Sequence, residues 1–303
     1  MTRDLIISWL ESRLQAGYLD DLTPGHTGAQ LARFRQEDGI LMVAKFFVPT
    51  AIIGAFDGSG DIEDNIRGYK SINELGGGAL VPPGYQVMEY EGVKVLVTKF
   101  LGDSFRTSVG SNPQESYTWI RGHLRAAFRN TLHPAIGNLS ASSVEGVRRS
   151  MTRFGKEVDA LTDGVLGRYL QSPWNFDGRQ LTLMLLDFTP DNVFVTRDHL
   201  SVIDPWGQST YLGNPAVSIG QFITLTEEVY GLSGALEGCA LLRRFAFQEI
   251  PKILECPAES VQVAFRLGMA LQYILSAYVR IRTESELARA FANRAVAVLK
   301  SIS

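Results

Sequence analysis

The pattern of apolar and polar positions divides the chain into a strand-rich first third and a helix-rich remainder. Within the first 100 residues, short apolar runs on either side of turn residues predict two β-hairpins, at 30–47 and 85–100. The first hairpin would turn at Asp38-Gly39, a dipeptide typical of tight hairpin turns. Amphipathic helices are predicted at 3–18 and 61–75, and a run of glycines predicts the end of the second helix.

The remaining two thirds of the chain is dominated by apolar residues at helical spacing. Such segments are 114–132, 142–171 and 261–299. The apolar stretches at 181–195 and 200–203 predict short strands that are separated by turn residues. Residues 102–113 are rich in Gly, Ser, Asp and Asn and predict the boundary between the two parts of the chain. We therefore expect an N-terminal unit at 1–102 and a C-terminal unit at 103–303.

Composition narrows the classes of protein that fit this pattern. The 303 residues are 45% hydrophobic, and 29 Lys and Arg against 32 Asp and Glu leave a formal net charge of −3. Disordered chains are poorer in apolar residues, and proteins that bind nucleic acid by electrostatics are basic, so we expect neither class. Two cysteines are too few for a disulfide framework or a zinc site with four cysteine ligands.

Neither a membrane span nor a secretory leader is visible in the pattern. The longest apolar run, 46–56, is interrupted by Pro49 and Gly54 and is shorter than the roughly 18 residues that a span needs. The first ten residues lack a basic region followed by a long apolar core. We therefore expect a cytoplasmic protein without a membrane or nucleic-acid partner, and the sequence leaves its oligomeric state open.

The segment 181–207 carries the residues best suited to chemistry. Asp187 and Asn192 lie five positions apart around a Pro-Asp turn, and Asp204 ends the apolar strand that follows. A carboxylate can orient a hydroxyl group and accept its proton, and carboxylate and amide oxygens are ligands that Mg²⁺ prefers. The grouping therefore predicts a hydroxyl nucleophile oriented by Asp187 and a divalent cation held by Asn192 and Asp204.

This spacing resembles the catalytic core of protein-kinase-like enzymes, in which an aspartate is followed five positions later by an asparagine and then by a metal-binding aspartate. More specifically, segments 185–192, 202–204 and 213–216 resemble the aminoglycoside phosphotransferase and choline kinase branch of small-molecule kinases. Leu185 stands where that family has a histidine, and Ser218 stands where it has an aspartate. The resemblance implies an α+β, bilobal protein-kinase-like fold, with a small antiparallel-sheet N-lobe and a larger, mainly helical C-lobe.

The N-terminal third contains residues that the same resemblance assigns to nucleotide binding. Lys45 lies in an apolar strand, where a lysine is otherwise unexpected, and stands where the family carries its phosphate-binding lysine. Gly25, Thr27 and Gly28 precede it in a loop whose backbone N–H groups would approach the nucleotide phosphates. Residues 95–102 resemble the hinge strand of the family.

The hinge and the acidic partner of Lys45 complete the implied nucleotide site. The hinge backbone would hold the adenine near Lys99, Phe100 and Leu101. The family register for the acidic partner falls at a glycine, Gly68, so an acid elsewhere on the predicted helix would have to substitute for it. The alternatives that stay open are Glu63, Asp64 and Glu74, of which Glu63 is taken into the predicted nucleotide site.

The resemblance implies a phosphotransferase that depends on ATP, or GTP, and Mg²⁺ and moves the γ-phosphate to a hydroxyl of a small molecule. That acceptor could be aminoglycoside-like, an amino alcohol, a sugar or a related compound. A catalytically inactive kinase-like nucleotide-binding module is one alternative. A protein kinase is a second, although the short segment between Asp204 and Pro215 leaves little room for a regulated activation segment. Glu227, Glu228 and Glu237 could attract a cationic substrate or form a solvated helix face.

Overall fold

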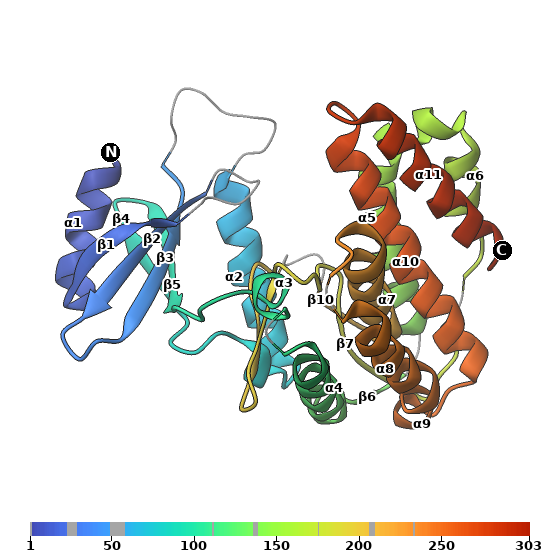
Figure 1. The fold of residues 1–303 in the computed structure, drawn as a ribbon, viewed down its shortest axis with the longest axis horizontal. Helices are drawn as coiled ribbons and strands as arrows, with labels where there is room; N and C mark the ends of the chain where they lie inside the picture. Colours follow the sequence, from blue (N-terminus) through green and yellow to red (C-terminus); the bar gives the residue numbers. More distant parts are fainter. Residues whose placement is uncertain are drawn as a thin grey trace.

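The computed structural model describes residues 2–22, 29–48, 58–110, 112–135, 139–174, 176–205, 210–232 and 234–303. A strand-rich N-terminal part and a larger, mainly helical C-terminal part are visible side by side in Figure 1. The expected bilobal α+β fold is therefore confirmed. The predicted boundary at 102–113 falls between the last strand of the sheet and the first long helix of the C-terminal part, and it stays a prediction.

A five-stranded antiparallel sheet forms the N-terminal part, in the order β1-β2-β3-β5-β4. Its strands are β1 (Ala16–Leu22), β2 (Gln30–Gln36), β3 (Leu41–Phe46), β4 (Gln86–Tyr90) and β5 (Val93–Lys99). Both predicted hairpins are present as β2–β3 and β4–β5. The first turns at Asp38-Gly39 as expected, and Gly39 adopts a φ of +84° that glycine tolerates without steric cost.

Helix α1 (Arg3–Leu14) covers one face of this sheet and corrects the first predicted element. The predicted helix at 3–18 is four residues too long, because Gln15 takes a left-handed φ of +50° and the chain continues as β1. Apolar residues of α1, among them Ile6 and Leu10, form the core of the N-terminal part together with buried residues of β2, β3 and β5. The strand β1 was not predicted, and its first three residues fall within the predicted helix.

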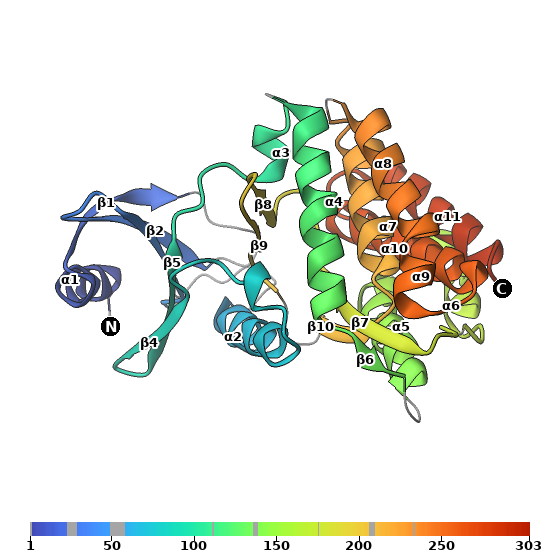
Figure 2. The same cartoon turned by 90° about the horizontal axis from the view of Figure 1, so that it is seen from below.

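Helix α2 (Gly58–Glu74) lies between the sheet and the C-terminal helices in both views (Figures 1 and 2). It packs on β3 and β5 on one side and on β10 (Thr210–Gly213) on the other. The short helix η1 (Gly78–Leu80) follows the glycine run and contacts the β9 strand (Leu200–Val202). This position places α2 beside the segments that carry the predicted chemistry.

The C-terminal part consists mainly of helices packed around a second, larger core. They are α3 (Phe105–Ser108), α4 (Pro113–Asn130), α5 (Leu139–Val158), η2 (Asp159–Thr162), α6 (Val165–Leu170), α7 (Ala216–Thr224), the π-helix η3 (Leu225–Val229), α8 (Ala235–Gln248), α9 (Ile250–Leu254), α10 (Ala258–Arg280) and α11 (Ser285–Lys300). The helix predicted at 142–171 is divided into α5, η2 and α6, because Asp163 takes a φ of +51° that ends the helical path. The apolar stretch 261–299 forms two helices, α10 and α11, which pack on each other.

Short strands connect the helices of the C-terminal part. The β7 strand (Gln180–Leu185) pairs with β10 and with β6 (His133–Pro134), and β8 (Val193–Val195) pairs with β9. The predicted strand at 181–195 is therefore two strands, separated by a loop that contains Asp187. Within the described residues, the model contains no helix that is both long and apolar enough to cross a membrane.

Candidate active site

The loop between β7 and β8 brings Asp187 and Asn192 together. The backbone N–H of Asn192 donates to the Thr189 carbonyl at 3.0 Å, which closes the loop into a tight turn. The side-chain amide Nδ2 of Asn192 then donates to Asp187 Oδ2 at 2.9 Å. This contact holds the Asp187 carboxylate in one orientation and leaves the amide oxygen of Asn192 as an acceptor.

The β8–β9 hairpin brings Asp204 to the same end of the site. Val193 pairs with Val202, and the N–H of Ile203 donates to the Asn192 carbonyl at 2.9 Å. Ile203, which follows β9, therefore lies beside Asn192, which precedes β8. Asp204 follows with a φ of +51°, a left-handed conformation that aspartate adopts more readily than most residues. Asp187, Asn192 and Asp204 are thus held by one loop and one hairpin.

Lys45 reaches this group from the N-terminal sheet. Its Nζ donates to Asp204 Oδ1 at 2.9 Å and to Asn65 Oδ1 at 2.9 Å. Lys45 is only 7% exposed and Asn65 is fully buried, so the amino group lies in a largely water-excluded position between the two parts of the chain. The structure therefore joins Lys45 and Asp204, which are 159 residues apart in the sequence.

The acids expected as helix partners of Lys45 lie elsewhere, and this part of the prediction is wrong. Glu63 Oε1 accepts from Lys94 Nζ at 2.5 Å, while Asp64 and Glu74 pair with basic residues of their own helix. Successive residues of an α-helix are rotated by about 100°, so a residue one or two positions from Asn65 cannot share its direction. Asn65 was not predicted, because the family resemblance implies an acid as the partner of Lys45 and nothing in the local sequence marks an amide for this role.

Gly68 explains why the expected register carries no side chain. A Cβ atom added to Gly68 would lie 2.2 Å from the carbonyl oxygen of Pro205, the residue that follows Asp204. Helix α2 therefore touches the backbone of this segment directly. One turn earlier, Asn65 Nδ2 lies 3.5 Å from the same Pro205 oxygen. Helix α2 therefore contacts the Asp204–Pro205 segment through the side-chain amide of Asn65 and the backbone of Gly68.

The predicted hinge lies within the described residues, whereas the predicted glycine loop does not. The N–H groups of Lys99 and Phe100 donate to the carbonyls of Pro83 and Leu41, each at 2.8 Å, so both are occupied by the protein itself. Leu101 follows them and is half-buried. Gly25, Thr27 and Gly28 lie outside the described residues. The nucleotide roles of all these positions stay predictions.

The two departures from the family pattern lie against each other. The Leu185 N–H, at the end of β7, donates to Ser218 Oγ on α7 at 2.9 Å. Both residues are buried, so this hydrogen bond is shielded from water. Ser218 therefore fixes the end of the strand from which the Asp187 loop begins.

A second polar group holds the outer side of the same loop and was missed in the sequence. Arg106 donates from its backbone N–H to the Pro190 carbonyl at 3.0 Å and from Nη1 to Asp191 Oδ1 at 3.1 Å. Tyr230 donates its hydroxyl to Asp191 Oδ2 at 2.5 Å, and the Arg106 guanidinium lies 3.8 Å from the centre of the Tyr230 ring. Burial, and then the hydrogen bond to Asp191, raise the pKa of Tyr230, so its phenol stays protonated at neutral pH.

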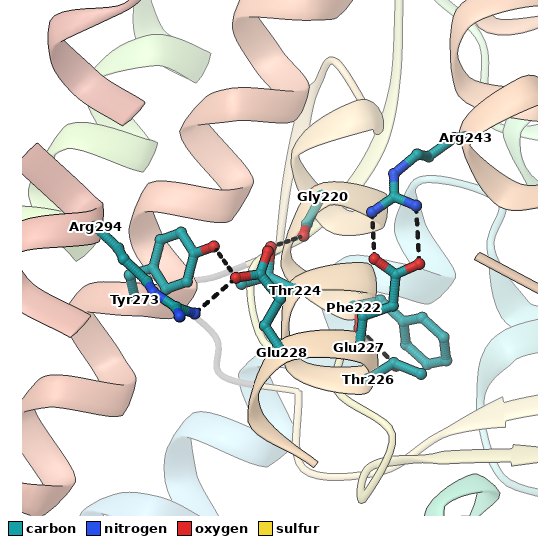
Figure 3. Close-up of polar contacts among 9 residues, drawn as sticks. All are labelled: Gly220, Phe222, Thr224, Thr226, Glu227, Glu228, Arg243, Tyr273 and Arg294. Carbon is teal, nitrogen blue, oxygen red and sulfur yellow. Dashed lines mark hydrogen bonds and ion pairs between the residues drawn. The ribbon is translucent and has the colours of Figure 1, made fainter. Parts of the chain in front are cut away.

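The neighbouring acids Glu227 and Glu228 of η3 point in opposite directions (Figure 3). Glu227 forms a two-bonded ion pair with Arg243 of α8. Glu228 accepts from Tyr273 at 2.5 Å and from Arg294 at 2.8 Å. Each carboxylate therefore has an arginine partner, and this pair of acids offers no unbalanced negative charge to a cationic substrate.

No family model matches the sequence, and no curated protein matches it. Comparison with solved structures gives clear matches. A spectinomycin phosphotransferase in complex with ADP and spectinomycin aligns with a TM-score of 0.55 and 12% identity, covering 100% of this chain and 98% of the other. An aminoglycoside-3′-phosphotransferase of type VIII aligns with a TM-score of 0.55 and 17% identity, covering 88% and 97%. A choline kinase from Cryptosporidium parvum aligns with a TM-score of 0.52 and 10% identity, covering 99% and 95%. At these identities the likeness establishes the fold, which is the one expected from the motifs.

Proposed function

We propose that this protein is a small-molecule kinase that transfers the γ-phosphate of ATP, or GTP, to a hydroxyl group. The observation that carries the proposal is the continuous set of contacts from Lys45 to Asp204 and, across the β8–β9 hairpin, from Asn192 to Asp187. A buried ammonium, two carboxylates and an amide are brought together from distant parts of the chain. Phosphoryl transfer requires such an arrangement, because its catalysis consists mainly of positioning and charge neutralisation.

Asp187 would orient the acceptor hydroxyl in this reaction. As the acceptor oxygen forms its bond to the γ-phosphorus, the bond from that phosphorus to the β–γ bridging oxygen breaks, and the nucleoside diphosphate leaves. The hydroxyl proton passes to the Asp187 carboxylate. The hydrogen bond from Asn192 fixes that carboxylate beforehand, and Lys45 would bind the α- and β-phosphates.

The donor set fits Mg²⁺. Asp204 contributes a carboxylate. The amide nitrogen of Asn192 donates its hydrogen bond to Asp187, so the amide oxygen is left to bind a metal ion. These are hard oxygen ligands of the kind that Mg²⁺ accepts together with phosphate oxygens and water. We therefore assign Asn192 and Asp204 as the residues that would hold the ion, which would supply positive charge to the phosphates.

The adenine would lie against the segment after β5. The N–H groups of Lys99 and Phe100 already donate hydrogen bonds to carbonyls of the protein. Of the three residues in this predicted hinge, Leu101 is therefore the one whose N–H could donate to a base. Carbonyl oxygens of the same segment accept further hydrogen bonds. This narrows the expected adenine contact from three residues to the backbone of Leu101 and its neighbouring carbonyls.

The test is a transfer assay with γ-labelled ATP and GTP over aminoglycosides, amino alcohols, sugars and nucleosides. The paired acids of η3 do not favour polycations, so neutral acceptors belong in the panel beside the aminoglycosides. We expect label on at least one small hydroxyl compound, and none without Mg²⁺. Nucleotide binding without transfer to any acceptor would favour the inactive module, and label on a general protein substrate would favour a protein kinase.

A further inference from the structure

We propose that Asn65 is a positioning residue whose side-chain amide fixes Lys45 of the N-terminal sheet against the Asp204–Pro205 segment. The assignment rests on the proposed function, since it concerns how the phosphate-binding lysine is oriented. The residue of α2 at this place is an amide, whereas the sequence led us to expect Glu63, Asp64 or Glu74 beside this lysine. The inference is carried by two separate observations, the contacts of the amide and the close approach at Gly68.

The first observation is that both ends of the Asn65 amide face a partner. Its Oδ1 accepts from Lys45 Nζ at 2.9 Å, and its Nδ2 lies 3.5 Å from the Pro205 carbonyl oxygen. Asn65 has no exposed surface, so neither partner is replaced by bulk water. A buried amide satisfied in this way holds its two partners at a fixed separation.

The chemistry of the two partners selects an amide. Lys45 offers only protons, and the Pro205 carbonyl offers only lone pairs. An amide presents an acceptor to the first and a donor to the second. A carboxylate in the same place would accept from Lys45, but its second oxygen would face the Pro205 oxygen without a proton between them. An aspartate at this position is therefore a poorer residue here, even though it would add a charge partner for the lysine.

The second observation is independent of side chains. Asn65 and Gly68 are three positions apart on α2 and therefore share one face of the helix. The absence of a Cβ at Gly68 allows the helix backbone to approach Pro205 closely, and this approach sets the distance that the Asn65 amide spans. The same face thus carries the contact that brings α2 close and the amide that uses this closeness.

The consequence is that Lys45 and Asp204 share one rigid support. Lys45 is held by α2, α2 is held by the Pro205 backbone, and Asp204 is the residue that precedes Pro205. A nucleotide would meet an ammonium group and a metal-binding carboxylate that are already aligned. Replacing Asn65 by alanine should leave the Lys45 side chain less firmly held and weaken nucleotide binding. An aspartate would add a charge partner for Lys45 but no N–H donor for Pro205, so it should not restore nucleotide binding.

The test compares Asn65→Asp and Asn65→Ala with the wild type, and Asn73→Asp is the matched control. Asn73 lies on the exposed face of the same helix, so the control adds the same charge away from Lys45. The readouts are the Kd of MgATP by calorimetry, the KM and kcat of transfer, and the melting temperature. We expect both Asn65 variants to weaken MgATP binding about tenfold, with a larger effect on KM than on kcat, and the control to match the wild type.

Two results would overturn the assignment. If Asn65→Asp binds MgATP within twofold of the wild type, the residue acts only as a neutral substitute for a carboxylate. If Asn65→Ala is unaffected, the amide positions nothing. A wild-type protein that binds no nucleotide would instead refute the proposed function, and this assignment with it.

If Asn65→Asp fails to fold, a second measurement still tests whether Asn65 positions Lys45. The melting temperatures of Asn65→Ala, Lys45→Met and the double variant then form a cycle. Residues that hold each other should give a double variant that loses less than the two single losses together. Fully additive losses would contradict the proposal.

Discussion

Replacing Gly68 by alanine should destabilise the protein, although alanine is the better helix former. In a solvated helix this change is worth about 0.5–1 kcal/mol in favour of alanine. At Gly68, however, the new Cβ would lie 2.2 Å from the Pro205 oxygen. Carbon–oxygen contacts in proteins are normally no closer than about 3.3 Å, so α2 and the Pro205 backbone would have to separate by about 1 Å.

The cost follows from that displacement. Overpacking of this kind typically costs about 1–3 kcal/mol, which exceeds the gain in helix propensity and leaves a net loss of about 0.5–2 kcal/mol. Activity should suffer more than stability, because α2 carries Asn65, which contacts Lys45. A displacement of about 1 Å at a positioned catalytic group can cost roughly 10²-fold in rate.

Urea unfolding of the variant beside Gly122→Ala provides the measurement. Gly122 lies exposed in the middle of α4, where an added Cβ meets no atom within 4 Å, so this control should gain about 0.5–1 kcal/mol. The two glycine-to-alanine changes should therefore shift the urea midpoint in opposite directions. If Gly68→Ala stabilises the protein as much as the control does, the close packing of α2 on the Pro205 segment is refuted.

Three further changes test separate parts of the account. Lys45→Met should weaken MgATP binding at least tenfold by calorimetry, whereas Lys94→Met, which removes the partly exposed lysine paired with Glu63, should not; equal losses would contradict the role of Lys45. Tyr230→Phe should lower kcat with little change in the KM for nucleotide, because Asp191 loses a hydrogen-bond donor. It should also lower the free energy of unfolding in urea by about 1 kcal/mol. An unchanged kcat would show that Tyr230 does not support the loop. Burial raises the pKa of Cys256 to about 11, so at pH 8 it should hold roughly 100 times less thiolate than an unburied cysteine and react correspondingly slowly with a disulfide reagent. Because the folded state keeps this proton when the unfolded chain loses it, stability should be constant below about pH 8 and fall as the pH rises toward 11; a melting temperature that rises over this range would contradict the burial.

The parts of the site that could be predicted are those fixed by neighbours in sequence. Asp187 and Asn192 are joined by one tight turn, and Asp204 is brought beside them by a two-stranded hairpin whose pattern is visible in the chain. Lys45 was detectable because a lysine in an apolar strand contradicts the usual burial preference. Local spacing and one violated preference therefore single out four residues, and the structure places Lys45 against Asp204 and Asn192 against Asp187. Their catalytic roles stay predictions.

The parts that could not be predicted depend on how distant elements dock. Asn65 contacts Lys45 only because α2 approaches the Pro205 backbone, and that approach is decided by tertiary packing at Gly68. Tyr230, which follows the π-helix η3, reaches Asp191 from 39 residues further along the chain. The break between α5 and α6 was missed because apolar spacing continues through a turn that backbone conformation imposes. Helical periodicity carries no information on any of these contacts.

The most direct test of the central claim is the rate of phosphate transfer by Asp187→Ala, measured on an acceptor found in the panel. General base catalysis and hydroxyl alignment predict a fall of about 10²–10⁴-fold in kcat, with the Kd of MgATP changed by less than about threefold. Asp198→Ala removes an exposed carboxylate from the turn of the neighbouring hairpin and should keep wild-type turnover. Near-normal turnover by Asp187→Ala would contradict the account.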